Sequence, residues 1–323
     1  MALSYEFSIG SVRARENSLF TNADIEQMLA CRGKEELIRF LNEKGFGDGS
    51  SIDEIIDNNT KEMWKYIRSV APSFDIFNTF FYQNDIHNLK VILKGIMAQR
   101  KYEGLLLHPC TIDTDTLIEA AENRKFTILP EWLSEPADKA YEILAHTGDA
   151  RLCDAVIDKA VMQKMLDECK NTKSEFLKKY FNTSVFYSNI KIALRASHTG
   201  ASKDYLLQAL CDGDGFRTEE VISSALKGHN ALVERLLKFS EYDCGRAMEE
   251  YKKSPSAFER FVDNRLMSLT KESCKRASSG AEPLMGYYLG CEAQKKAVHI
   301  ISSGLQTQTP ADIIRERLRE IYG

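Results

Sequence analysis

The chain has 323 residues, of which 43% are hydrophobic and 28% are charged, and these proportions are ordinary for a soluble globular protein. Its 43 basic and 47 acidic side chains give a formal charge of −4, which provides no field for attracting nucleic acid, so we expect no nucleic-acid partner. No apolar run approaches the roughly 18 residues that span a bilayer. Eight cysteines without a C-x-x-C pair, and a start without the apolar stretch of a signal peptide, indicate reduced intracellular thiols.

Spacing of apolar residues predicts an all-α protein, because they recur every three or four positions along most of the chain. After an ordinary first helix, the glycine-rich stretch 45–49 predicts a turn, and Ser51 with Glu54 predicts a capping box that opens the next helix. Two apolar stripes follow and are expected in the core: Phe74, Phe77 and Phe81, then Ile86, Leu89, Leu93 and Ile96. Near the end, Thr309 is expected to cap a helix whose first residue is Pro310.

Two sequence markers repeat with one phase. Asp57, Asp158 and Asp263 each follow an Ile or Val, and the two intervals between them are nearly equal. The separation between Asp57 and Asn88 is identical to the separation between Asp158 and Asn189. In the third copy the corresponding motif is expected at Lys295, one position further from its aspartate, and is degraded there.

A repeat of about one hundred residues is too long for a solenoid unit and indicates a small domain copied three times. We therefore predict three similar helical domains, residues 1–109, 110–214 and 215–323, related by rotation about a pseudo-threefold axis. Proline is scarce and no low-complexity linker separates the copies, so the domains are expected to pack on one another.

No local catalytic or ligand-binding motif is present, and we expect no catalytic residue, no metal and no cofactor. The glycines at 45–49 lack the Lys-Ser/Thr of a P-loop. The segment 212–216 resembles the start of a calcium loop, but Arg217 and Ser223 occupy the positions that need glycine and glutamate. The six histidines include no pair at i, i+4, and there is no G-x-S-x-G elbow.

The helix-borne amides Asn88 and Asn189 have two interpretations. In the first, which we favour, they satisfy backbone groups inside the protein, the usual situation of inward polar side chains. In the second, they face a common axis together with Lys90 and Lys191 and contact a partner.

Several stretches together resemble the C subunit of the V/A-type ATP synthases, the counterpart of the d subunit of eukaryotic V-ATPases. They are "SIGSVRARENSLFT", "TID" followed by "LPEWL", the acid-x-x-Asn-Leu-Lys motif and the C-terminal "RERLREIYG". The similarity runs from about Tyr5 to Tyr322, and its best-matched positions are Val12, Arg13, Ala14, Glu16, Arg315, Arg317, Leu318 and Tyr322. The third copy departs from the family, with Lys295-Lys296-Ala297 in place of Asn-Leu-Arg.

This resemblance implies a funnel-shaped, non-catalytic central-stalk subunit that takes part in ion transport. Its implied partners are the rotor shaft subunits of the D and F type and the membrane proteolipid ring. It implies a cytoplasmic protein, peripheral on the inner face of the membrane, and we expect a monomer when it is isolated. Possible partner contacts are Arg13, Arg15, Asn88, Lys90, Asn189, Lys191 and Arg195.

Three alternatives are a free-standing helical adaptor or scaffold, a peripheral lipid binder of annexin type, and a helical enzyme with a composite site. Annexins use four shorter repeats with glycine-rich calcium loops, which this sequence lacks. An enzyme would show a deep pocket with converging ionisable groups.

Overall fold

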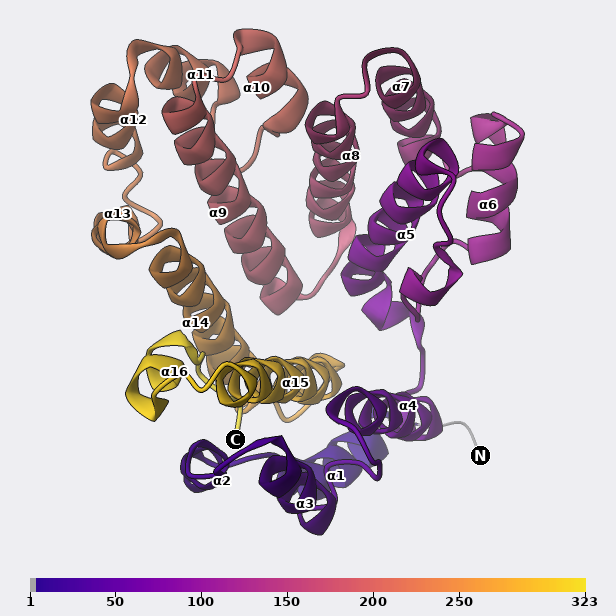
Figure 1. The fold of residues 1–323 in the computed structure, drawn as a ribbon, viewed down its shortest axis with the longest axis vertical. Coiled ribbons are helices and arrows are strands. Elements are labelled where there is room, and N and C mark those ends of the chain that lie inside the picture. The colour runs from indigo at the N-terminus through magenta and orange to yellow at the C-terminus, as the bar shows by residue number, and fades with distance from the viewer. Residues whose placement is uncertain (1–3) are drawn as a thin grey trace. The chain divides into compact units, whose positions relative to one another are not determined.

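A computed structural model describes residues 4–323. The chain forms two compact units. Unit 1 holds the residues up to Phe74 together with Arg246–Gly323, and unit 2 is Asp75–Gly245. The described residues form sixteen α-helices and three short 3-10 turns without a strand, which confirms the predicted all-α class (Figure 1). The predicted domain boundaries at 109/110 and 214/215 both fall inside unit 2.

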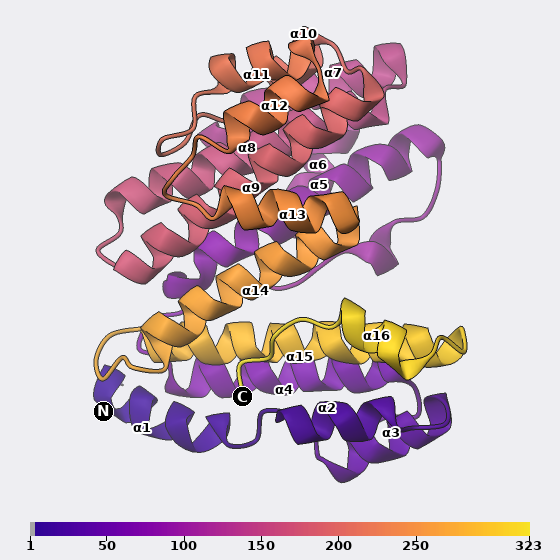
Figure 2. The same ribbon diagram turned by 90° about the vertical axis from the view of Figure 1, so that its left-hand side faces the viewer.

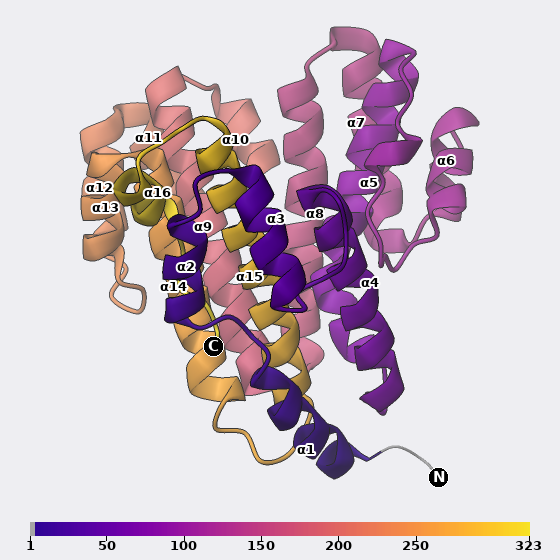
Figure 3. The ribbon, with the colours of Figure 1, turned by 60° about the horizontal axis from the view of Figure 1, so that its bottom comes forward.

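Unit 1 is built from the two ends of the chain. Its helices are Tyr5–Glu16 (α1), Asn22–Leu29 (α2), Lys34–Glu43 (α3), Ile52–Val70 (α4), Pro255–Cys274 (α14), Glu282–Gln306 (α15) and Ala311–Arg317 (α16). The helix Cys244–Lys253 (α13) spans the boundary between the units. Within unit 1, α15 runs beside α4 (Figure 2) and α3 packs on both of them (Figure 3).

The core of unit 1 joins residues that are far apart in sequence. Ile55, Leu37 and Met28 from the N-terminal part meet Val298 and Ile301 from α15 in one cluster, and all of these side chains are fully buried. Because such contacts form only after both chain ends are in place, the unit depends on the C-terminal segment for its stability.

Unit 2 contains the middle of the chain. Its helices are Asn78–Ala98 (α5), Thr114–Glu122 (α6), Glu131–Thr147 (α7), Ala150–Asn171 (α8), Glu175–Thr199 (α9), Lys203–Ala209 (α10), Thr218–Lys227 (α11) and His229–Leu236 (α12). Helix α8 packs against α5, α7 and α9. Of the predicted core residues of α5, Ile86, Leu89 and Leu93 are buried as expected, whereas Ile96 is only half-buried.

Of the two helix starts predicted from capping residues, one is confirmed and one is wrong by a residue. Ser51 caps α4 by accepting a hydrogen bond from the Glu54 amide at 3.2 Å, but the Glu54 carboxylate accepts from Ser50 instead of completing the box. The prediction at the end of the chain was wrong by one position: α16 begins at Ala311, and the Thr309 hydroxyl pairs with Thr307.

The aromatic stripe does not form a single helical face. Phe74 is half-buried and precedes α5, where its ring lies 5.5 Å from Trp64, whereas Phe77 and Phe81 are buried. The glycine-rich stretch 45–49 is a turn, as predicted. Asn42 both donates to and accepts from the backbone of Gly49, at 3.0 and 3.1 Å, so that amide is used within the turn.

Candidate functional site

The first marker amide, Asn88, is fully buried on α5 and holds the backbone of one residue in the following loop. Its Nδ2 donates to the Leu107 carbonyl at 3.0 Å, and its Oδ1 accepts from the Leu107 amide at 2.7 Å. An amide side chain can satisfy both backbone groups of one residue in this way.

The second marker amide, Asn189, makes the same pair of hydrogen bonds on α9. Its Nδ2 donates to the Cys211 carbonyl at 2.7 Å, and its Oδ1 accepts from the Cys211 amide at 3.0 Å. Both residues are fully buried. We call this arrangement the amide clamp. Its recurrence at positions of equal phase supports the repeat, and the burial of both amides favours the internal interpretation over a partner contact.

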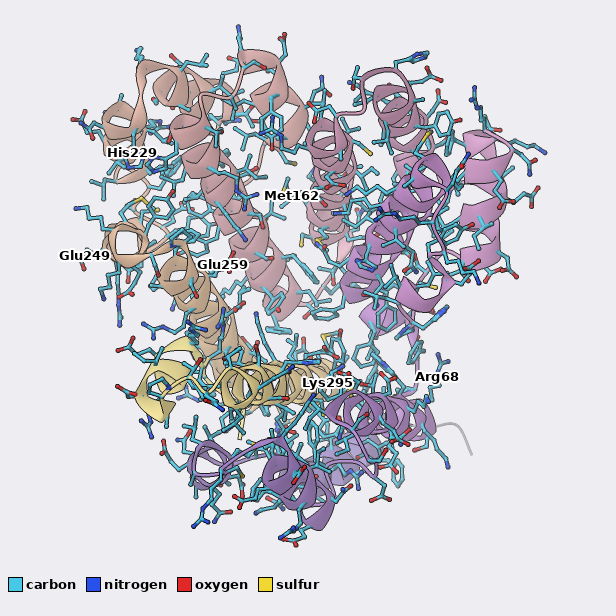
Figure 4. All side chains as sticks on the ribbon, in the orientation of Figure 1. Arg68, Met162, His229, Glu249, Glu259 and Lys295 are labelled. Atoms are coloured by element: carbon cyan, nitrogen blue, oxygen red, sulfur yellow. The ribbon has the colours of Figure 1, made fainter. Side chains whose placement is uncertain are left out.

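The third copy carries the amide one position before the predicted residue. Gln294, which follows Asp263 at the spacing of the two asparagines, is 3% exposed, and its Nε2 makes no hydrogen bond with the residues described. Lys295, where the motif was expected, pairs with Glu292 at 2.6 Å and donates to Thr60 on α4 at 3.3 Å (Figure 4). The third copy therefore lacks the clamp, and its buried donor has no partner among the described residues.

Replacing Gln294 by Leu is expected to leave stability unchanged or raise the free energy of unfolding by about 1 kcal/mol. An unsatisfied buried polar group carries a desolvation penalty of about 1–3 kcal/mol, and the apolar side chain removes it. Urea unfolding followed by circular dichroism measures the change. A loss of more than about 2 kcal/mol, which is the size expected for breaking buried hydrogen bonds, would show that the amide has a partner and a structural role.

The loop after α5 is held by further side chains of the same helix. Asp85 is fully buried and accepts hydrogen bonds from the amides of Thr111 and Ile112, at 2.8 and 3.0 Å. Burial raises the pKa of Asp85 despite these donors. Asp85 and Asn88, the acid and the asparagine of the acid-x-x-Asn-Leu-Lys motif, thus bind the backbone of the same loop.

The lysines of the first copy form a ladder of ion pairs between α5 and α8. Lys90 lies 2.7 Å from Asp158, and Lys94 lies 2.6 Å from Asp154. The Lys90 side chain is only 22% exposed. Lys90 and the marker Asp158 were both found in the sequence, but their pairing was not, because it depends on how the two helices pack.

Reversing the charge of Lys90 is expected to lower the free energy of unfolding by about 1–2 kcal/mol. Lys90→Glu places a carboxylate against Asp158, and the pair is partly shielded from water. The matched control is Lys90→Glu combined with Asp158→Lys, which restores an opposite pair. If the double variant is no more stable than Lys90→Glu in urea unfolding, the ion pair does not contribute as described.

The two arginines of the opening helix contact other parts of unit 1. Arg13 forms an ion pair with Glu16 at 2.8 Å and donates to the carbonyls of Cys274 and Ala277, at 2.7 and 3.0 Å. Arg15 is exposed and lies over the ring of Tyr66, 5.5 Å from its centroid. Arg13 therefore fastens α1 to the end of α14, a role that the sequence alone did not indicate.

The remaining two predicted contact residues lie on α9. Lys191 is half-buried, whereas Arg195 is exposed, and its guanidinium makes no hydrogen bond or ion pair with the described residues. Arg195 lines an open cleft of about 700 Å³ between α7, α8, α9 and α10. Other charged residues of the cleft are Lys139, Arg151, Asp149, Asp154, Asp158 and Asp204.

Most charges of this cleft are already engaged. Asp154 and Asp158 pair with the α5 lysines, Lys139 donates to Gln208 at 2.6 Å, and Asp149 caps α8. The carboxylates therefore do not converge on one point, as a general acid and base would require. Arg195 is the predicted contact residue that the structure leaves most open to a partner.

A histidine pair joins α9 to α12 and was missed in the sequence because its members lie on different helices. The rings of His198 and His229 have centroids 4.3 Å apart, and His229 Nδ1 lies 3.2 Å from the Ser197 hydroxyl. Burial, followed by the nearby His198, lowers the pKa of His229.

This pair is expected to make unit 2 less stable in mild acid. The pKa of His229 is lower in the folded protein than the ordinary 6.5, so the unfolded chain binds the proton more readily. The stability of unit 2 is therefore fully present above pH 6.5 and decreases as the pH falls below it. The thermal unfolding midpoint of the wild type should fall more below pH 6.5 than that of His229→Gln. Parallel pH profiles would contradict this assignment.

Metal-binding side chains do not cluster among the described residues. Within residues 4–323, no group of three or more His, Cys, Asp or Glu side chains could hold a metal ion. Asp212, the first residue of the segment that resembles a calcium loop, accepts hydrogen bonds from the amide and hydroxyl of Thr218. No helix in the same range is long and apolar enough to cross a membrane.

These features define an all-α protein in which Asn88, Asn189 and the Lys90–Asp158 pair fasten its own helices and loops. Residues 8–317 match the profile of the ATP synthase (C/AC39) subunit family, and the chain belongs to this family. It is 22% identical over 357 residues to the C subunit of the A-type ATP synthase of Methanocaldococcus jannaschii, covering 96% of this chain and 85% of that protein.

Other relatives have similar coverage. The C subunit of the A-type ATP synthase of Haloferax volcanii is 21% identical over 343 residues, covering 97% of both chains. The C subunit of the V-type sodium ATPase of Enterococcus hirae is 19% identical over 321 residues, covering 96% of this chain and 97% of that protein. These alignments agree with the family resemblance found in the sequence.

Proposed function

We propose that this chain is the non-catalytic central-stalk subunit of a V/A-type rotary ATPase, which couples the rotor shaft to the membrane proteolipid ring during ion transport. The observation that carries the proposal is the family match over residues 8–317, together with relatives named as C subunits that align along nearly their whole length. On this proposal the shaft partners are subunits of the D and F type. The chain is cytoplasmic and peripheral on the inner face of the membrane, and it is a monomer when isolated.

The way the polar groups are used supports a mechanical role. The amide clamps, the α5–α8 ladder and the Arg13 contacts all join one helix or loop to another within a unit. Such cross-links stiffen each unit, and a coupling subunit needs stiffness to transmit torque. The proposal includes three similar domains arranged around one axis. Such an arrangement would form a funnel with one opening for each partner.

A binding experiment tests the proposal against a free-standing adaptor. The purified chain should recruit isolated shaft subunits to ring-containing membranes from which the native subunit has been stripped, and the shaft should not bind those membranes without it. A chain that binds neither the shaft subunits nor the membranes would contradict the coupling role.

Arg195 provides a point test of the same proposal. Reversal to Glu at this exposed position is expected to weaken recruitment about tenfold or more if the cleft faces a partner, while leaving the unfolding midpoint unchanged. Arg39→Glu on α3 is the matched control, because Arg39 is also exposed. If both variants recruit the shaft subunits equally well, the cleft is not part of the partner surface. The coupling role is then tested by the binding experiment alone.

A further inference from the structure

The loop after α5 displays two leucines to solvent. Leu105 is 60% exposed and Leu107 is 43% exposed, although they lie close together in the chain. The other large apolar side chains with high exposure among the described residues are separated from one another in sequence: Phe7, Leu207, Leu226, Leu237 and Ile313. Single exposed leucines are common on protein surfaces, whereas a pair in one loop needs an explanation.

This loop is fixed to α5 through its backbone. Asn88 clamps Leu107, the ring Nε2 of His87 lies 3.0 Å from the Leu105 carbonyl, and Asn84 donates to the Pro109 carbonyl at 2.7 Å. The helix side chains thus bind backbone groups on both sides of the leucine side chains. A loop held in this way does not turn its leucines inward, so their exposure is built into the structure.

The start of the loop is anchored as well. Gly95 on α5 leaves room for Tyr102, since a Cβ at position 95 would lie only 3.0 Å from the Tyr102 Cβ. The amide of Tyr102 donates to the Glu103 carboxylate at 3.1 Å, and Glu122 of α6 also lies close to Tyr102, so the carboxylates near this loop gather at the Tyr102 anchor. Two cations, Arg100 and Lys101, precede this anchor, and both are exposed.

Exposed basic side chains a few residues from exposed leucines in one loop are a combination that associates with the surface of an anionic membrane. A specific protein partner usually buries more than about 1,000 Å², which requires a wider apolar surface than two leucines provide. A membrane surface needs only a few inserted side chains, and it complements the charge of Arg100 and Lys101. We propose that the loop 100–108 is a membrane-surface contact that binds anionic phospholipid, with Leu105 and Leu107 entering the interface.

This contact goes beyond the coupling role and does not depend on it. It would add a lipid attachment to a chain that has no membrane-crossing helix within residues 4–323. Because it requires no other protein, it can be measured with the purified full chain and pure lipid. Its failure is therefore distinct from a failure to bind shaft or ring.

The test is co-sedimentation of the full chain with vesicles of phosphatidylcholine alone and of phosphatidylcholine mixed with phosphatidylglycerol. The wild type should bind the anionic vesicles, weakly or not at all the neutral ones, and less as salt is added. Leu105→Ser combined with Leu107→Ser should lower the partition coefficient about tenfold. Lys101→Glu should lower it about thirtyfold on anionic vesicles, since each charge near such a surface contributes about 1 kcal/mol.

The matched control is Leu226→Ser combined with Leu237→Ser, two leucines that are 50% and 51% exposed elsewhere in unit 2. This control should bind as the wild type does, and all variants should keep the wild-type unfolding midpoint because the replaced side chains are exposed. Equal binding by the loop variant and the wild type would overturn the proposal. The proposal would also be overturned if the wild type did not bind anionic vesicles and the loop variant no longer bound ATPase-containing membranes. That result would assign the leucines to a protein partner.

Discussion

Removing the Tyr322 side chain should lower the free energy of unfolding of this protein by about 3–5 kcal/mol, the range for replacing a large buried aromatic by alanine. Tyr322 is 1% exposed and packs on α15 in unit 1. Two glycines one helical turn apart make room for it. A Cβ at Gly286 would lie 2.6 Å from the Tyr322 hydroxyl oxygen, and one at Gly290 would lie 2.9 Å from the Tyr322 Cβ.

Tyr322→Phe is the matched control for this prediction. The Tyr322 hydroxyl is buried close to Glu16 and Arg13 but makes no well-formed hydrogen bond to either, so its removal should change stability by less than about 1 kcal/mol. Gly290→Ala should destabilise, because the new methyl group meets both Tyr322 and Leu19. Urea unfolding of the three variants measures these effects. A small loss in Tyr322→Ala would mean that unit 1 does not rely on the end of the chain.

Breaking the second amide clamp should cost about 2–4 kcal/mol, whereas breaking the first should cost about 1–2 kcal/mol. In Asn189→Ala, the amide and carbonyl of Cys211 lose their partners in the interior, where each unsatisfied group costs about 1–3 kcal/mol. In Asn88→Ala, the freed groups belong to Leu107, which is 43% exposed, so water can replace the lost hydrogen bonds.

Unfolding in urea, with the slope checked for two-state behaviour, measures this difference. The comparison is internal, because the same substitution is made at equivalent positions of two copies. If both variants lose the same amount, the accessibility of the clamped residue does not control the effect. If neither variant is destabilised, the clamp does not contribute to folding.

Much of the helical architecture could be predicted from the sequence because it depends on local spacing. The stripe Ile86, Leu89 and Leu93 identified the buried face of α5. The phase shared by the aspartates and the amides identified Asn88 and Asn189, which the structure shows in the same backbone clamp. An inward polar residue between buried apolar positions is a signal that sequence alone carries.

What could not be predicted depends on tertiary contacts. The partners of Lys90 and Arg13 lie on helices far away in sequence, and a pattern within one helix does not identify them. The motif of the third copy was expected at Lys295, one residue after the buried Gln294, because the sequence there does not show which of the two positions faces inward. The exposure of Leu105 and Leu107 was missed because leucine in a helical protein is by default a core residue.

The coupling role is tested most directly by measuring ATP hydrolysis and ATP-driven ion uptake in the same membranes, with and without this chain. The proposal predicts that membranes lacking the chain leave ATP hydrolysis by the soluble head intact but show no ion uptake, and that adding back the purified chain restores uptake. Ion uptake that continues at the wild-type rate in its absence would contradict the proposal.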